Sequence, residues 1–180
     1  FRAIYANLTQ KKLSEGASTI TQQLIKGYFL SPEKTFSRKL KEIILSIELE
    51  RKYSKDEILA FYLNQIPYGA NAYGIESASA TFFNKHSDNL TIAEAALLSA
   101  LPKAPSYYSP YGLHKDELLK RKDYILEKMH SLGFITKEEF ENAKLEPLIF
   151  APQRKTIKAP HFVMYVKDYL ENKYGEDYIL

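Results

Sequence analysis

Helix-start signals recur along this chain, and each is a polar cap followed by apolar residues at helical spacing. Three segments fit the capping box, in which a hydroxyl accepts the third backbone N–H and a glutamate returns to the cap's own N–H. These segments are Ser54 to Glu57, Thr91 to Glu94 and Thr136 to Glu139. They predict helices over residues 55–64, 92–101 and 137–144.

Three longer helices are predicted by the same periodicity, over residues 36–53, 115–132 and 161–174. Gly133 and Gly175 are expected to end the last two, because glycine readily adopts the left-handed backbone that closes a helix. The segments 101–110 and 148–160 are predicted to be extended or irregular. No set of alternating strands is visible, so the sequence predicts an all-α, mainly helical fold.

A further capping box at Thr19 and Gln22 predicts a helix that begins with a stripe of polar side chains. Gly16 to Ser18 would form the turn before it, and the stripe consists of Thr19, Gln22, Gln23 and Lys26. A small-residue turn at a helix N-terminus favours anions, because free N–H groups and the helix dipole point outward. The alternative is an ordinary capped helix with one face in solvent.

The helix predicted over 36–53 carries apolar residues on two nearly opposite arcs. One arc holds Leu40, Ile43, Ile44 and Ile47, and the other holds Leu45 and Leu49. We therefore expect it to be buried on two sides, with Glu42 at an apolar margin and in need of cationic partners. Arg38, Lys39 and Lys41 are the near candidates. The alternative is a plain ion pair between Arg38 and Glu42.

Composition narrows the choice of partners only partly. Of the 25 Lys and Arg and 22 Asp and Glu residues, Phe1 to Lys55 hold 11 and 5, which gives +6 there and −3 in the remainder. A positive field of this kind can attract phosphates, an anionic membrane surface or nucleic acid. No apolar run reaches the length of about 18 residues that a membrane span needs, so any anchor is expected outside this chain.

Metal and redox chemistry find little support in the sequence. The chain has no cysteine, and its histidines (His86, His114, His130 and His161) lack zinc-ligand spacing, so no metal site is predicted. Apolar and basic residues mix at 29–38, as is typical of a lipid headgroup boundary. The alternative there is a loop folded back on the core.

Four ordered motifs resemble the peptidoglycan glycosyltransferase domain of bifunctional class A penicillin-binding proteins and their monofunctional relatives. They are GASTITQQLIK at 16–26, RKLKE at 38–42, SKDEILAFYLN at 54–64 and EAALLSALPKAP at 94–105. The resemblance runs from Phe1 to Leu180. It implies a lysozyme-like fold with a large lobe and a small membrane-facing lobe, on the outer face of the bacterial cytoplasmic membrane.

The resemblance also implies an activity. Such domains polymerise lipid II into β-1,4-linked glycan, release undecaprenyl pyrophosphate and are inhibited by moenomycin. In the family pattern Ser18, Gln22 and Gln23 line the cleft near the phosphosugar, and Glu42 is the second family glutamate, which supports the leaving group. Lys26, Arg38 and Lys39 can stabilise the pyrophosphate, with Lys41 a weaker candidate. The motifs at 54–64 and 94–105 are expected to be mainly structural.

The family's first motif, which supplies the glutamate that deprotonates the acceptor hydroxyl, is absent from this chain. We expect it immediately before Phe1. The single domain is predicted to span 1–180, with 148–180 leading towards a transpeptidase domain as C-terminal partner. The sequence requires no cofactor and leaves room for a divalent cation.

Three other functions remain open at this point. A lysozyme-like enzyme that cleaves glycan would share the helical fold and the single visible carboxylate. A non-catalytic binding module at the membrane would tolerate the missing base. Nucleic-acid binding by the basic N-terminal third is the most distant alternative, and it predicts a steeply salt-dependent affinity for DNA.

Overall fold

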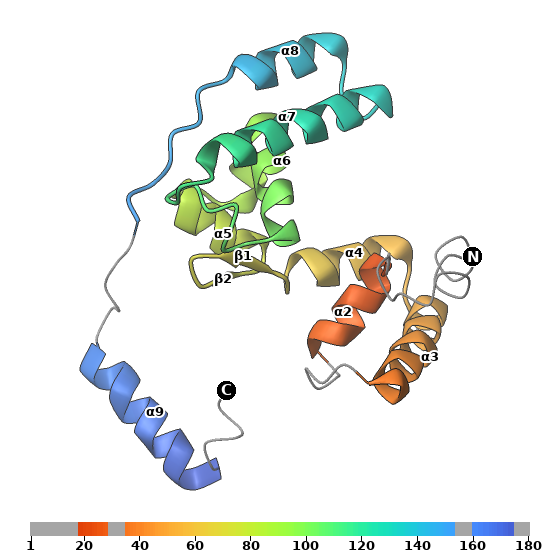
Figure 1. Cartoon of the computed structure of the whole chain (residues 1–180), viewed down its shortest axis with the longest axis vertical. Coiled ribbons are helices and arrows are strands. Elements are labelled where there is room, and N and C mark those ends of the chain that lie inside the picture. The colour runs from red at the N-terminus through yellow and green to blue at the C-terminus, as the bar shows by residue number, and fades with distance from the viewer. Residues whose placement is uncertain (1–17, 29–34, 154–159, 175–180) are drawn as a thin grey trace. The chain divides into compact units, whose positions relative to one another are not determined.

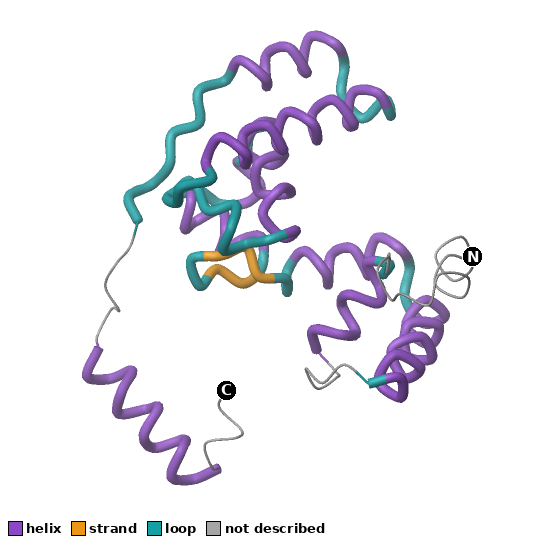
Figure 2. Tube along the Cα trace, in the orientation of Figure 1, coloured by secondary structure: helices purple, strands orange, loops and turns teal. Residues whose placement is uncertain are grey.

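The computed structural model describes residues 18–28, 35–153 and 160–174, and these are mainly helical (Figure 2). The elements, labelled in Figure 1, are α2 (Ile20–Tyr28), α3 (Phe36–Lys52), α4 (Lys55–Leu63), β1 (Pro67–Gly69), β2 (Ala72–Tyr73), α5 (Ile75–Phe82), the 3-10 turn η1 (Ser87–Asn89), α6 (Ile92–Ala100), the 3-10 turn η2 (Leu101–Lys103), α7 (Lys115–Ser131), α8 (Lys137–Leu145) and α9 (Pro160–Tyr174). The mainly helical fold class is thus confirmed.

Local sequence determines where most of these helices begin and end. Both hydrogen bonds of the predicted capping boxes form at Ser54, Thr91 and Thr136. Gly133, with φ of 77°, follows α7 and ends it as predicted. Gly175, the expected end of α9, lies outside the described residues.

Helix α5, the hairpin β1–β2 and the 3-10 turn η1 were not predicted. Helix α5 begins after Gly74, which has no side chain to cap it, so it lacks the polar start signal found elsewhere. The antiparallel hairpin β1–β2 contradicts the expectation of no strands. Its strands have three and two residues, too few to show an alternating pattern.

Two glycines allow this hairpin and the start of α5 to lie close to neighbouring backbone. Gly69 and Gly74 have φ of 89° and 81°. A Cβ at Gly74 would lie 2.5 Å from the carbonyl oxygen of Asn64, and one at Gly69 would lie 2.8 Å from that of Pro105. Only glycine fits such positions without a shift of the backbone.

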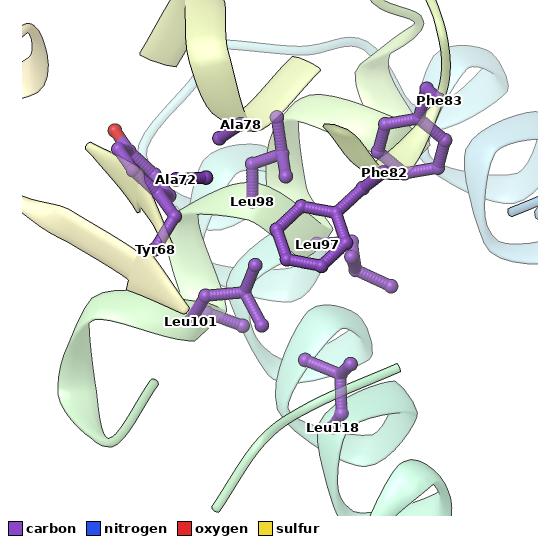
Figure 3. Packing of buried hydrophobic residues seen from close by; sticks show 10 residues of the cluster. Tyr68, Ala72, Ala78, Phe82, Phe83, Leu97, Leu98, Leu101 and Leu118 are labelled. Carbon is purple, nitrogen blue, oxygen red and sulfur yellow. The ribbon is translucent and has the colours of Figure 1, made fainter. Parts of the chain in front are cut away.

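The main apolar core joins the hairpin, α5, α6, η2 and α7. Figure 3 shows its side chains converging from these elements. The buried members are Tyr68, Ala72, Ala78, Phe82, Phe83, Leu97, Leu98, Ala100, Leu101 and Leu118. A second cluster, built on Ala93, Ala96, Leu126, Ile135 and Ala143, packs α8 against α6 and α7. The motif at 94–105 therefore lies largely within the core.

All elements before α9 belong to one compact unit, Phe1–Phe150, and α9 belongs to a second unit, Ala151–Leu180. The prediction that 1–180 forms one domain with a lead-out from 148 stays a prediction.

Candidate functional site

Helices α2 and α3 contact each other, and both contact α4 (Figure 1). The predicted capping box at the start of α2 forms: the Thr19 N–H donates to Gln22 Oε1 (3.3 Å), and the Gln22 N–H donates to Thr19 Oγ1 (3.2 Å). Ser18 lies just before the helix. Gly16 and Ala17, the rest of the predicted turn, lie outside the described residues.

The face of α2 that packs on its neighbours consists of Thr21, Leu24 and Ile25, all of which are buried. Gln23 and Lys26 are exposed and Gln22 is half-buried, so the polar stripe remains accessible. Ile20 is exposed, although it lies one helical turn before the buried Leu24. The core face is therefore rotated towards Thr21 and Ile25.

Helix α3 contradicts the prediction that its apolar arcs are buried on two sides. Its buried residues are polar, Glu42 and Ser46. All of its large apolar residues except the half-buried Leu49 are exposed: Phe36, Leu40, Ile43, Ile44, Leu45 and Ile47. The reason is that the Glu42–Ser46 side of α3 packs against α2, to which Lys39 and Glu50 bond from the same side. The periodicity located the apolar stripes correctly but could not say whether protein covers them.

Lys39 is the centre of the polar cluster between α2 and α3. Its Nζ donates to Ser18 Oγ (3.2 Å) and Gln22 Oε1 (3.4 Å), and it pairs with the Glu42 carboxylate one turn along α3. Glu42 is 1% exposed, whereas the Lys39 side chain is 44% exposed. The structure thus brings four predicted site residues together around one ammonium group that solvent still reaches.

Glu42 is also tied into α3 itself. The Ser46 hydroxyl donates to the Glu42 backbone carbonyl (2.7 Å) inside the buried face. Burial of a carboxylate is costly unless it is paired and hydrogen-bonded, and the Lys39 ammonium provides that pairing. The Glu42 carboxylate is therefore buried next to α2 with Lys39 between it and solvent. An incoming anion would contact the Lys39 ammonium and not the Glu42 carboxylate.

The remaining predicted cations lie on the same two helices. Lys26 is exposed near the end of α2, and no hydrogen bond or ion pair reaches it from the part of the chain that the structure describes. Arg38 is half-buried beside Lys39, and its backbone N–H donates to Thr35 Oγ1 (3.1 Å), which caps α3. Lys41 is exposed.

A second set of contacts joins the cluster to α4. The Gln23 side chain donates from Nε2 to the Ser18 carbonyl (3.3 Å), and its Oε1 accepts from the Tyr62 hydroxyl (3.2 Å). Sequence reasoning did not single out Tyr62. The two partners are 39 residues apart, and no local pattern encodes such a contact.

A third contact fixes α2 along α3. The buried Thr21 hydroxyl donates to Glu50 Oε1 (2.6 Å). Glu50 follows Ser46 and Glu42 at four-residue intervals, so this spacing was the available signal for the packed face of α3. Thr21 and Glu50 also line a hollow of about 690 Å³ with Ile20, Tyr53 and Leu59. This hollow does not include Lys39 or Glu42, so it is separate from the polar cluster.

Comparison with known proteins gives the decisive observation. A transglycosylase family model matches residues 1–130. The chain belongs to the transglycosylase family. This confirms the resemblance to the transglycosylase domain of class A penicillin-binding proteins.

Relatives of this transglycosylase chain are penicillin-binding proteins. It is 44% identical over 175 residues to penicillin-binding protein 1A of Aquifex aeolicus (strain VF5), covering 97% of this chain and 24% of that protein. It is 41% identical over 180 residues to penicillin-binding protein 1A of Escherichia coli (strain K12), covering 98% and 21%. The transglycosylase chain therefore spans about a quarter or less of these relatives.

A solved structure shares the fold. Penicillin-binding protein 1A from Haemophilus influenzae matches with a TM-score of 0.52 and 26% identity, over 92% of this chain and 21% of that one. In the described part of this transglycosylase, no helix is both long and apolar enough to cross a membrane. Among the same residues, no group of three His, Cys, Asp or Glu side chains could hold a metal ion.

Proposed function

We propose that this transglycosylase domain polymerises lipid II into β-1,4-linked peptidoglycan glycan and releases undecaprenyl pyrophosphate. The observation that carries the proposal is the Lys39 ammonium, which Ser18, Gln22 and the buried Glu42 hold in place while it remains open to solvent. Pyrophosphate is an anion whose departure needs charge stabilisation more than a proton. A preorganised cation supplies that stabilisation without reorganising during the reaction.

In the proposed reaction, the 4-hydroxyl of the acceptor sugar attacks the anomeric carbon of the growing chain. The bond from that carbon to the pyrophosphate oxygen breaks with inversion, and the pyrophosphate takes the electron pair. Lys39 binds the departing oxygens, with Lys26 and Arg38 as further cations. The acceptor proton goes to the glutamate of the family's first motif, so Glu42 serves to hold Lys39 and is not the base.

Ser18, Gln22 and Gln23 are proposed to line the cleft beside the phosphosugar. Their hydroxyl and amide groups suit a ligand rich in hydroxyls and phosphate oxygens. A moenomycin-type inhibitor, as a phosphate-bearing glycolipid, would bind the same residues. The proposal requires no cofactor from the protein, and an EDTA titration of the polymerisation assay tests whether a divalent cation assists.

The exposed apolar stripe of α3 supports action at a membrane surface. Phe36, Leu40 and Ile44 follow one another at four-residue intervals and are 88%, 52% and 53% exposed. An apolar stripe of this kind, next to the basic residues of α3, suits the boundary between lipid headgroups and acyl chains. We propose that this lobe faces the outer surface of the cytoplasmic membrane, where a lipid-linked substrate resides.

The test is polymerisation of purified lipid II by the full-length protein, with Glu42→Gln as the variant and Glu48→Gln as the matched control. Glu48 lies on the same helix but is exposed and pairs with Arg51 (3.2 Å). Glu42→Gln should lower the rate about 100-fold, and Glu48→Gln should leave it unchanged. Equal rates for Glu42→Gln and wild type would refute the proposal. Cleavage of preformed glycan in place of polymer formation would favour the lysozyme-like alternative.

A further inference from the structure

We propose that Tyr62 is a positioning residue, which acts through Gln23 and Ser18 to set the place of the Lys39 ammonium. This inference rests on the proposed function, because Lys39 is the group that would meet the pyrophosphate. Tyr62 lies on α4, a helix that contributes no other hydrogen bond to the Lys39 cluster among the described residues.

Hydrogen bonds link Tyr62 to Gln23 and Gln23 to the Ser18 backbone, and the Ser18 side chain in turn bonds Lys39. The Tyr62 hydroxyl meets Gln23 Oε1 (3.2 Å), Gln23 Nε2 donates to the Ser18 carbonyl (3.3 Å), and Ser18 Oγ accepts from Lys39 Nζ (3.2 Å). The Ser18 carbonyl can only accept, so the Gln23 amide must present its NH₂ group there. Its oxygen then faces Tyr62, which makes the phenol a donor. The Tyr62 hydroxyl therefore donates to Gln23, and Gln23 donates to the backbone of Ser18.

Ser18 needs such support because it stands outside the helix. The backbone ladder of α2 starts with the Thr19 carbonyl, which accepts the Gln23 N–H (2.9 Å), and the Gln22 N–H is taken by Thr19 Oγ1. Within the described residues, the Gln23 side chain is what holds the Ser18 carbonyl. Loss of that bond leaves the Ser18 peptide to rotate, and its hydroxyl would then leave Lys39.

Tyr62 is itself well placed to hold Gln23. The capping box at Ser54 fixes the start of α4, and Ile58, one turn before Tyr62, is buried. The phenol is half-buried, and this burial raises the pKa of Tyr62 above its ordinary value of 10.0. It therefore remains a protonated donor throughout the pH range of an enzyme assay.

The test compares Tyr62→Phe, Gln23→Ala and the double variant in the full-length protein, with lipid II as substrate. Tyr62→Phe should lower kcat about fivefold with little change in KM, because the displaced ammonium stabilises the departing pyrophosphate less well, and the melting temperature should stay within about 2 °C of wild type. In the Gln23→Ala background, Tyr62→Phe should have no further effect, because the two residues act in series. Tyr53→Phe is the control: its hydroxyl makes no hydrogen bond within the described chain, and the ring packs edge-on against Phe61.

A measurement without substrate separates this inference from the proposed function. Hydrogen exchange of the peptide that covers residues 18–24 should be about fivefold faster in Tyr62→Phe than in wild type or Tyr53→Phe. If wild type makes no polymer while exchange responds in this way, the proposed function fails and the positioning of Ser18 by Tyr62 stands. Unchanged exchange, or additive losses in the double variant, would overturn the inference.

Discussion

Lys39 has three N–H bonds and meets three acceptors, a hydroxyl, an amide oxygen and a carboxylate. Its donors are thus directed before any ligand arrives. Glu42 is buried and depends on the Lys39 ammonium to offset the cost of its burial. Lys39 is half-exposed, so a second anion can reach the ammonium and take the place of one of these acceptors. Folding and binding are therefore coupled at this residue, and a double variant can separate them.

We predict that Lys39→Met lowers the free energy of unfolding by about 2 kcal/mol, since it leaves the Glu42 carboxylate buried without its cation. The half-exposed position of Lys39 places this value below that of a fully buried pair. The double variant Lys39→Met/Glu42→Gln should regain most of the stability, because no charge is then buried. Urea unfolding curves of the three proteins measure this.

The affinity of these variants for moenomycin should not follow their stability. Both Lys39→Met and the double variant should bind at least about tenfold more weakly than wild type, because neither offers the ammonium to a phosphate. Lys52→Met, which removes an exposed lysine at the end of the same helix, is the control. If the double variant recovered affinity together with stability, Lys39 would be a structural residue only.

At the scale of elements, features that depend on residues close together in sequence could be predicted, and features that depend on residues far apart could not. The capping boxes at Ser54, Thr91 and Thr136 were predictable because donor and acceptor are three residues apart. The orientation of α3 was not, since its covered face depends on contacts with α2 and α4, and apolar spacing alone does not reveal which side they cover. Tyr62 was missed for the same reason.

Alanine substitutions at Gly74, before α5, and at Gly27, near the end of α2, should change the stability of the protein in opposite directions. Gly74→Ala places a Cβ against the Asn64 carbonyl at a positive φ, so we expect a loss of at least about 2 kcal/mol of stability. Gly27 has nothing within 4 Å of its added Cβ and lies inside a helix, so Gly27→Ala should add about 0.5 kcal/mol. Thermal unfolding of the two variants checks both signs, and a gain for Gly74→Ala would contradict the hairpin geometry.

Across the whole molecule, composition and helix signals were enough to predict a mainly helical domain, and four motifs identified the family. The candidate site was predicted as a residue set, and the structure brings Ser18, Gln22, Lys39 and Glu42 into contact. The functional roles of all the predicted site residues, Arg38 and Lys26 included, stay predictions, as does the general base of the family's first motif. Phe29 to Lys34, the centre of the predicted headgroup boundary, lies outside the described residues.

Stability of the core should depend on alkaline pH through Tyr68. Burial, together with the nearby Tyr62, raises the pKa of Tyr68 far above its ordinary value of 10.0. The unfolded chain loses this proton first, so the contribution is intact below pH 10 and decreases as pH rises from there towards the folded pKa. We expect unfolding free energy to fall between pH 10 and 11.5 with a shallower slope in Tyr68→Phe than in wild type. Identical slopes would argue against this burial.

The exposed apolar stripe of α3 also has a calorimetric consequence. The heat capacity of unfolding arises mostly from newly exposed apolar surface. Phe36, Leu40, Ile44 and Ile47 are already at least half in contact with solvent in the folded chain. Melting of this 17-residue helix in aqueous buffer therefore adds less heat capacity than its length and its apolar content would suggest.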